Sequence, residues 1–116
     1  PLWIGSGPAD VSLRRVARLA DGWIALLTPD QDLAEAVARL RRHTEEAGRD
    51  PDAMTVETLI GVAGGGPDDW RATVERLAEA GVTHVALASG RDQGRAPQQH
   101  LDTLLAGLDA LRSFCG

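Results

Sequence analysis

The chain has 116 residues, 43% hydrophobic and 25% charged, which is typical of a single globular domain and argues against disorder. Its net charge of −5 disfavours nucleic acid as a partner, because non-specific nucleic-acid binding needs a basic face. No stretch reaches the roughly 18 apolar residues of a membrane span, and we identify no signal-peptide pattern, so we expect a cytoplasmic protein with no membrane partner. A single cysteine, Cys115, cannot form an internal disulfide.

Short apolar runs alternate with amphipathic stretches along the first half of the chain. The first run, residues 2–4, ends at a Gly-rich turn, and a helical pattern follows over residues 10–20. The second run, residues 23–27, is entirely apolar, so we expect a strand buried on both faces. The spacing of Thr28 and Gln31 matches a capping box, which predicts a helix over residues 29–47 with Thr28 as its cap.

The second half of the chain repeats the same alternation. A β-branched segment over residues 54–62 predicts the third strand, and a helix opens at Pro67. Residues 82–88 predict the fourth strand, and a polar loop then leads to a helix that opens at Pro97. We expect the apolar face of this last helix to consist of its leucines, which are Leu101, Leu104, Leu105, Leu108 and Leu111.

Four strand–helix units in succession predict an α/β fold with a parallel sheet and right-handed crossovers, in one domain over residues 1–116. Periodicity leaves two architectures open: a doubly wound open sheet of the flavodoxin type, or part of a (β/α)8 barrel. Both place functional residues in the loops that follow the carboxyl ends of the strands.

The histidines give no sign of a metal site, because no two of them have the spacing of metal ligands. His84 lies in the fourth predicted strand, where it either faces a ligand or fills a structural position, and we favour the structural role. His43 and His100 lie in predicted helices beside charged residues, so we expect both on the surface.

A Gly-rich turn, Gly5-Ser6-Gly7, joins the first strand to the first helix. Such a turn lets the backbone approach an anion, and the helix that follows offers unpaired N–H groups and the positive end of its dipole. The turn equally fits an ordinary strand–helix connection that needs glycine for its dihedral angles. The residues alone therefore predict either a phosphate cradle or a plain turn.

Three phrases of this sequence resemble the luciferase-like monooxygenase family, in the branch that uses the deazaflavin coenzyme F-420. They are PLWIGSGP at residues 1–8, RRVARLADGW at residues 14–23, and AGVTHV at residues 80–85, the last followed by a Gly-containing loop and a final helix. The resemblance implies the C-terminal half of a TIM barrel, built from its last four β/α units. It leaves the catalytic residues unknown, because in this family the N-terminal units supply most of them.

The resemblance also implies a cofactor, coenzyme F-420 or FMN, and a small organic substrate for hydride transfer or oxygen activation. The residues that match its phosphate-binding loops are Gly5, Ser6, Gly7, Thr28, Ser89, Gly90 and Arg91. For Thr28 we favour helix capping over phosphate contact, and Arg91 is either a counter-charge or a solvated loop residue.

Half a barrel would leave two strand edges and an apolar face uncovered, which favours association. We therefore expect either a fragment with a covalent continuation upstream or a homodimer that completes the barrel. Two alternatives to an oxidoreductase part remain: a noncatalytic half-barrel that binds a ligand or a partner, and a flavodoxin-like regulatory domain.

Overall fold

A computed structural model describes residues 1–90 and 95–115 of the chain. The chain divides into two compact units. The first unit comprises Pro1–Thr58 and Ala78–His84, and the second comprises Leu59–Leu77 together with the described part of Val85–Gly116. Each unit has its own cluster of buried apolar side chains, and each is described by itself below.

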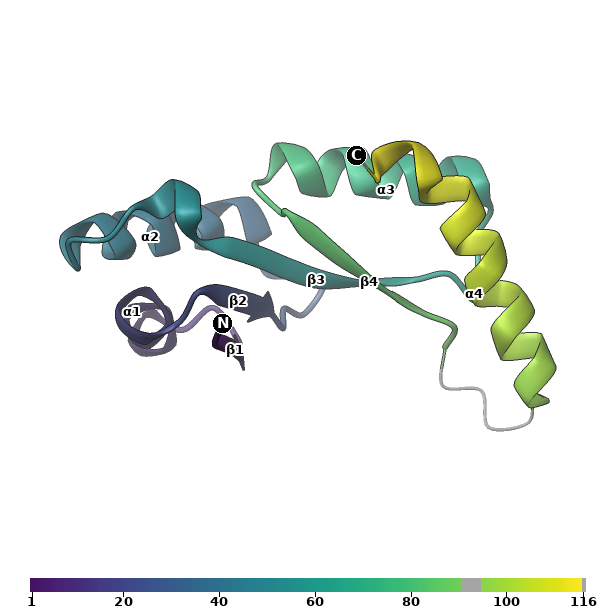
Figure 1. The fold of residues 1–116 in the computed structure, drawn as a ribbon, viewed down its shortest axis with the longest axis horizontal. Coiled ribbons are helices and arrows are strands. Elements are labelled where there is room, and N and C mark those ends of the chain that lie inside the picture. Colours follow the sequence, from purple (N-terminus) through teal and green to yellow (C-terminus); the bar gives the residue numbers. More distant parts are fainter. Residues whose placement is uncertain (91–94, 116) are drawn as a thin grey trace. The chain divides into compact units, whose positions relative to one another are not determined.

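Four parallel strands alternate with four helices, as the sequence predicted (Figure 1). The strands pair in the order β1-β2-β3-β4, so each strand is added beside the one before it. A doubly wound sheet reverses its strand order at a switch point, whereas a barrel does not, so this order favours the barrel type. The elements are β1 (Trp3–Ser6), α1 (Asp10–Leu19), β2 (Gly22–Ala25), α2 (Leu33–Glu46), β3 (Thr55–Gly61), α3 (Pro67–Glu79), β4 (His84–Ala88) and α4 (Pro97–Leu111).

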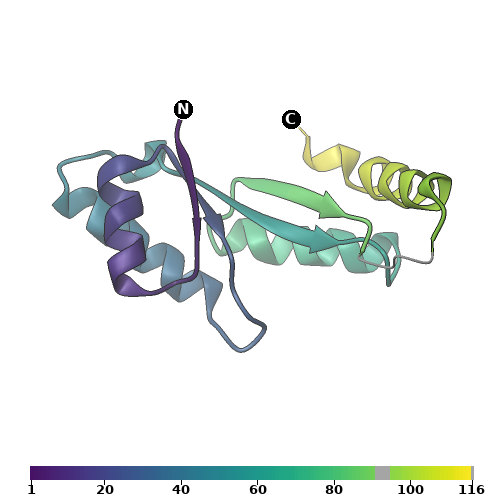
Figure 2. The same ribbon diagram turned by 90° about the horizontal axis from the view of Figure 1, so that it is seen from below.

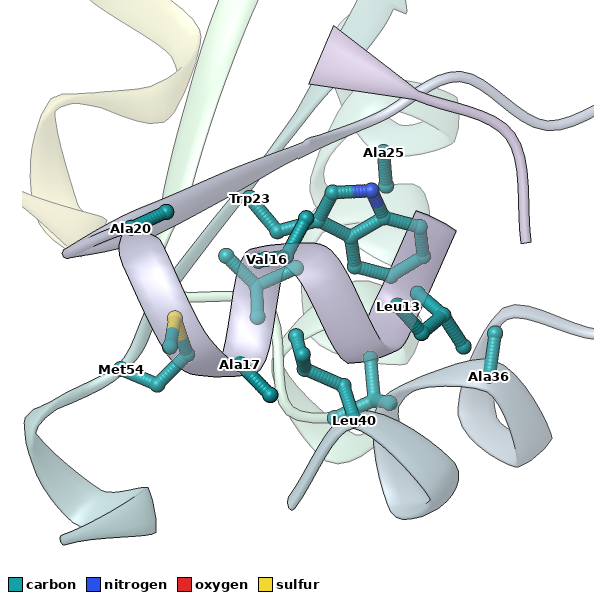
Figure 3. Close-up of a cluster of buried hydrophobic side chains, with 11 residues drawn as sticks. Leu13, Val16, Ala17, Ala20, Trp23, Ala25, Ala36, Leu40 and Met54 are labelled. Carbon is teal, nitrogen blue, oxygen red and sulfur yellow. The ribbon is translucent and has the colours of Figure 1, made fainter. Parts of the chain in front are cut away.

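The core of the first unit lies between α1, α2 and the first two strands (Figure 2). Trp23 of β2 is fully buried there, beneath the apolar stripe of α1 (Figure 3). The stripe has the three- and four-residue spacing that the sequence predicted, and α2 packs its own stripe against it. The buried apolar residues of these two helices are Leu13, Val16, Ala17, Ala36, Val37 and Leu40, with Ala20 directly after α1.

A buried histidine joins the two helices of the first unit, so the prediction that His43 lies on the surface is wrong. Its side chain is 6% exposed, with Nε2 2.7 Å from Asp10 Oδ1 at the start of α1 and Nδ1 3.3 Å from Glu46 Oε2. This hydrogen bond from His43 holds the pKa of the Asp10 carboxyl below its usual value, and nearby Arg14 and Arg39 act in the same direction.

The second helix begins four residues later than predicted. Asp32 caps it, because the Asp32 carboxylate accepts a hydrogen bond from the Glu35 backbone N–H at 3.1 Å. The preceding residues, 28–31, form a turn in which the Gln31 N–H donates to the Thr28 carbonyl at 3.0 Å. Thr28 and Asp32 are both possible caps for this helix, and the structure uses Asp32. The negative charge of Asp32 also interacts favourably with the positive end of the helix dipole.

The second strand is also shorter than predicted. It ends at Ala25, and the side chain of Leu26 is 58% exposed, so the apolar run is not buried on both faces. Residues 22–25 pair with β1 on one side, and residues 22–24 pair with β3 on the other.

The core of the second unit lies between α3, α4 and the ends of β3 and β4. Trp70 and Val74 of α3 pack there beside Ile60 and Val62. The Trp70 indole Nε1–H donates to the Gly64 carbonyl at 3.0 Å, which connects α3 to the loop that precedes it.

The predicted leucine face of α4 is only partly correct. Leu111 is buried and Leu104 half-buried, but Leu101, Leu105 and Leu108 are exposed. The buried side of the helix is formed instead by small residues, Gly107 and Ala110. A Cβ at Gly107 would lie 3.1 Å from Val62 Cγ1, so the helix approaches the sheet too closely for a large side chain there.

Within residues 1–90 and 95–115, no helix combines the length and apolar character that crossing a membrane requires.

Candidate functional site

The Gly5-Ser6-Gly7 segment lies at the carboxyl end of β1 and is fixed by the neighbouring strand. β1 extends through Ser6, so the turn that was predicted to begin at Gly5 begins only at Gly7. The indole Nε1–H of Trp23 lies 3.1 Å from both the Ser6 carbonyl oxygen and Ser6 Oγ. The Leu26 N–H also donates to the Ser6 carbonyl, at 3.0 Å. The Ser6 hydroxyl donates to the Gly7 carbonyl at 3.0 Å, so its single proton is engaged within the turn. The buried tryptophan therefore holds the backbone of this turn in one place.

Neither the backbone angles nor the packing of the chain requires glycine at positions 5 and 7. Neither Gly5 nor Gly7 has a positive φ, so a plain turn that needs glycine for its dihedral angles is not what the structure contains. A Cβ at Gly7 would meet only the Leu26 carbonyl oxygen, at 3.6 Å, and at Gly5 only ordinary contacts of 3.7 Å or more. Gly22 is the contrasting case, because a Cβ there would lie 2.7 Å from the Trp3 ring and would also collide with Thr55 Oγ1. Gly5 and Gly7 each therefore leave free space for a Cβ atom, with the nearest protein atoms 3.6–3.8 Å away.

The start of α1 lies directly after this turn. Its N-cap residue is Ala9, which has no side chain to bond the first N–H groups, while Ser12 and Leu13 bond to the Ala9 carbonyl. The one carboxylate in the first turn, Asp10, is engaged by Arg14 at 3.0 Å and by His43 at 2.7 Å. A helix start without a side-chain cap, beside a backbone with free space, can accept an anion.

Thr28 follows β2 in the same unit and is exposed. Its hydroxyl donates to the Asp30 carboxylate, and its N–H donates to the Gln31 side chain at 2.9 Å. The predicted role as cap of a helix starting at Pro29 is therefore wrong. The hydrogen bond from Thr28 lowers the pKa of Asp30, so a negative charge lies beside this hydroxyl.

Ser89 and Gly90 follow β4 in the second unit. The Ser89 hydroxyl lies 2.8 Å from His100 Nδ1, and the Ser89 carbonyl accepts from the Arg95 guanidinium at 3.1 Å. Gly90 has φ +93°, and a Cβ there would lie 2.9 Å from that of Ala63, so this position requires glycine. His100 is half-buried, so the prediction that it lies on the surface is only partly correct.

The structure thus divides the predicted site residues between the two units. Gly5, Ser6, Gly7 and Thr28 belong to the first unit, while Ser89 and Gly90 belong to the second. Arg91 lies outside the described residues. His100 was not predicted as a site residue, because its partner Ser89 is eleven residues away and their contact depends on where α4 begins. Trp23 was predicted only as core, although its indole also fixes Ser6.

The other predicted histidine position is structural in character. His84 is exposed at the start of β4, where its ring packs edge-on against Trp3 with the ring centroids 5.3 Å apart. Its Nδ1 lies 2.9 Å from the Thr83 hydroxyl. Among the residues that the structure describes, no group of three or more His, Cys, Asp or Glu side chains could hold a metal ion.

Comparison with known proteins gives a family match and a fold match. The family model for luciferase-like monooxygenases matches residues 1–107. The uncharacterized proteins Rv0940c of Mycobacterium tuberculosis and Mb0965c of Mycobacterium bovis are each 40% identical over 88 residues, which is 75% of this chain. The match spans only 27% of the length of each relative.

Among solved structures, the fold is similar to that of the coenzyme F-420-dependent tetrahydromethanopterin reductase from Methanopyrus kandleri. The TM-score is 0.67 at 15% sequence identity, and the match covers 98% of this chain and 51% of the reductase. At this level of identity the likeness concerns the fold.

Proposed function

Because the chain belongs to the luciferase-like monooxygenase family, we propose that it forms the phosphate-binding C-terminal half-barrel of an oxidoreductase that uses coenzyme F-420 or FMN. The cofactor, when bound, supplies hydride transfer or oxygen activation toward a small organic substrate. The part of this chain is to hold and orient the cofactor through its phosphate. Acid–base side chains for the reaction are not assigned to this chain.

One observation carries the proposal: the free space beside Gly5 and Gly7 at the carboxyl end of β1. Since neither backbone angles nor packing require glycine at these positions, their small size is explained by a group from outside the chain. The helix start directly after them offers N–H groups that no side chain caps. Free N–H groups at a helix start, beside a backbone that leaves room for an anion, favour phosphate binding.

The other members of the proposed site contribute unequally. Ser6 acts through its backbone, since its hydroxyl proton is held by the Gly7 carbonyl. Thr28 contributes only if its hydroxyl leaves Asp30. Ser89 and Gly90 belong to the other unit, and we propose them as a separate contact for a phosphate. For Arg91, which lies outside the described residues, we keep the predicted role of counter-charge. We prefer F-420 to FMN because the sequence phrases match the branch that uses it.

A noncatalytic half-barrel is the second candidate, because likeness of fold does not by itself establish an activity. The matched segment spans about a quarter of the length of the curated relatives. Such a module would bind the phosphate of a ligand or bind nothing.

The test is titration of the purified chain with F-420 and separately with FMN, followed by fluorescence. Gly7→Asp places a carboxylate in the free space beside the turn, and we expect it to abolish saturable binding. Ala38→Asp, at an exposed position on α2, adds the same charge elsewhere and serves as the matched control. Binding that Gly7→Asp leaves unchanged would refute the cradle, and no binding by the wild-type chain would leave the noncatalytic module.

A further inference from the structure

The Ser89 side chain is held by the first turns of α4. Its Oγ lies 2.8 Å from Nδ1 of His100, and both residues are half-buried. The Arg95 guanidinium donates to the Ser89 carbonyl and to the Gln99 carbonyl, each at 3.1 Å, which joins the end of β4 to the helix. The adjacent Gly90 has a left-handed backbone, φ +93°, and a Cβ there would lie 2.9 Å from that of Ala63, so a larger residue would disturb the backbone next to Ser89.

The direction of the bond between Ser89 and His100 decides what the serine can bind. A hydroxyl has one proton, and an imidazole nitrogen is a donor only when it carries a proton. If Nδ1 carries none, Ser89 donates its proton to His100 and presents only lone pairs to an incoming phosphate oxygen. If Nδ1 is protonated, it donates to Ser89 Oγ, and the hydroxyl proton can be given to the phosphate.

We infer that His100 is a positioning residue for Ser89, and that phosphate binding by this serine requires a proton on Nδ1 of His100. The inference rests on the proposed function, because it assumes that Ser89 contacts the cofactor phosphate. It adds to that function His100, which was not among the predicted site residues, and the condition that Nδ1 of this histidine carries a proton. Arg95 has a different part, since its guanidinium is used in fixing the backbone of Ser89 and the helix start.

The protonation of His100 can be read directly by nitrogen NMR of the chain labelled with ¹⁵N-histidine. The His100 signals are assigned by their loss in His100→Asn, and the chain is titrated with F-420, with FMN and with inorganic phosphate. We expect a protonated Nδ1 at His100 in the saturated complex. A saturated complex in which Nδ1 carries no proton would overturn the inference and leave the cradle at Gly7 intact.

A double-mutant cycle tests whether His100 acts through Ser89. We expect Ser89→Ala and His100→Leu each to weaken binding of the cofactor by about tenfold, the scale of one hydrogen bond to a charged group. The double variant should be no weaker than either single variant, since the two side chains act as one unit. His100→Asn, whose amide nitrogen is always a donor, should bind within about threefold of wild type.

Gln98→Leu is the matched control, because Gln98 lies in the same helical turn and bonds only Asp102 among the described residues. Circular dichroism and thermal unfolding establish that each variant is folded. If His100→Leu still weakens binding in the Ser89→Ala background, His100 does not act through Ser89 and the inference fails. If Ser89→Ala leaves binding unchanged, the inference fails while the proposed function stands. If the wild-type chain binds none of the probes, both fail.

Discussion

Replacing Gly22 with alanine is the sharpest test of the packing at the start of β2. A Cβ there would lie 2.7 Å from Cδ2 of Trp3 and would collide with Thr55 Oγ1, so the Trp3 ring or the strand must shift by several tenths of an ångström. Overpacking of this kind typically costs about 1–3 kcal/mol of folding stability. Gly7→Ala has ordinary contacts and no positive φ, so it should be neutral or stabilise by about 0.4–1 kcal/mol through the unfolded chain.

The assay is urea unfolding of both variants, followed by tryptophan fluorescence and by circular dichroism. We expect a lower midpoint for Gly22→Ala and an unchanged or higher midpoint for Gly7→Ala. Thr55→Ala in the Gly22→Ala background should recover part of the loss, because it removes one of the two colliding groups. A Gly22→Ala chain as stable as wild type would refute the reasoning, and so would equal destabilisation by the two alanine substitutions.

Two further predictions concern the helices. Leu13→Ala should lower the free energy of unfolding by about 2–5 kcal/mol, because this fully buried side chain leaves a cavity. Leu105→Ala should change the free energy of unfolding by no more than about 0.5 kcal/mol, because this side chain is 53% exposed. Urea unfolding of the two variants measures the difference between them. A large loss of stability in Leu105→Ala would contradict the exposure of this face of α4. The hydrogen bond from His43 lowers the pKa of Asp10 in the folded chain. This hydrogen bond therefore contributes to folding stability at pH values above the unfolded-state pKa of about 3.9, and the contribution is lost as the pH falls through the folded-state pKa. Asp10→Asn should therefore be less stable than wild type at about pH 7, and this difference should shrink as the pH falls below the ordinary pKa of an aspartate. A difference that is independent of pH would disprove the coupling.

The alternation of strands and helices was predictable from the sequence because each element carries its own periodic signal. Local chemistry also fixed the starts of α3 and α4, at Pro67 and Pro97, since proline is favoured in the first turn and few competing caps lie nearby. The start of α2 was not predictable to the same precision, because Thr28 and Asp32 are both good caps and only the folded chain selects between them.

Other features were not predictable because they depend on contacts between distant parts of the chain. His43 is buried since Asp10, thirty-three residues earlier, lies against it in the folded unit. The exposed leucines of α4 reflect the same limit. A hydrophobic stripe in the sequence indicates which side of a helix is apolar. In α4, the packed side is instead the one where Gly107, which has no side chain, lets the helix backbone approach Val62 closely.

Gly5, Gly7 and Gly22 look alike in the sequence but have different surroundings in the structure. Gly22 is explained within the chain, because Trp3 occupies the space of its missing side chain. Gly5 and Gly7 have only ordinary contacts at the position of a Cβ, so the packing of the chain does not explain why glycine stands there. Gly22→Ala should therefore lower the free energy of unfolding, whereas Gly7→Ala should lower the affinity for the cofactor in a chain at least as stable as wild type. If Gly7→Ala changes neither property, the free space beside the turn has no ligand, and the oxidoreductase proposal loses the observation that carries it.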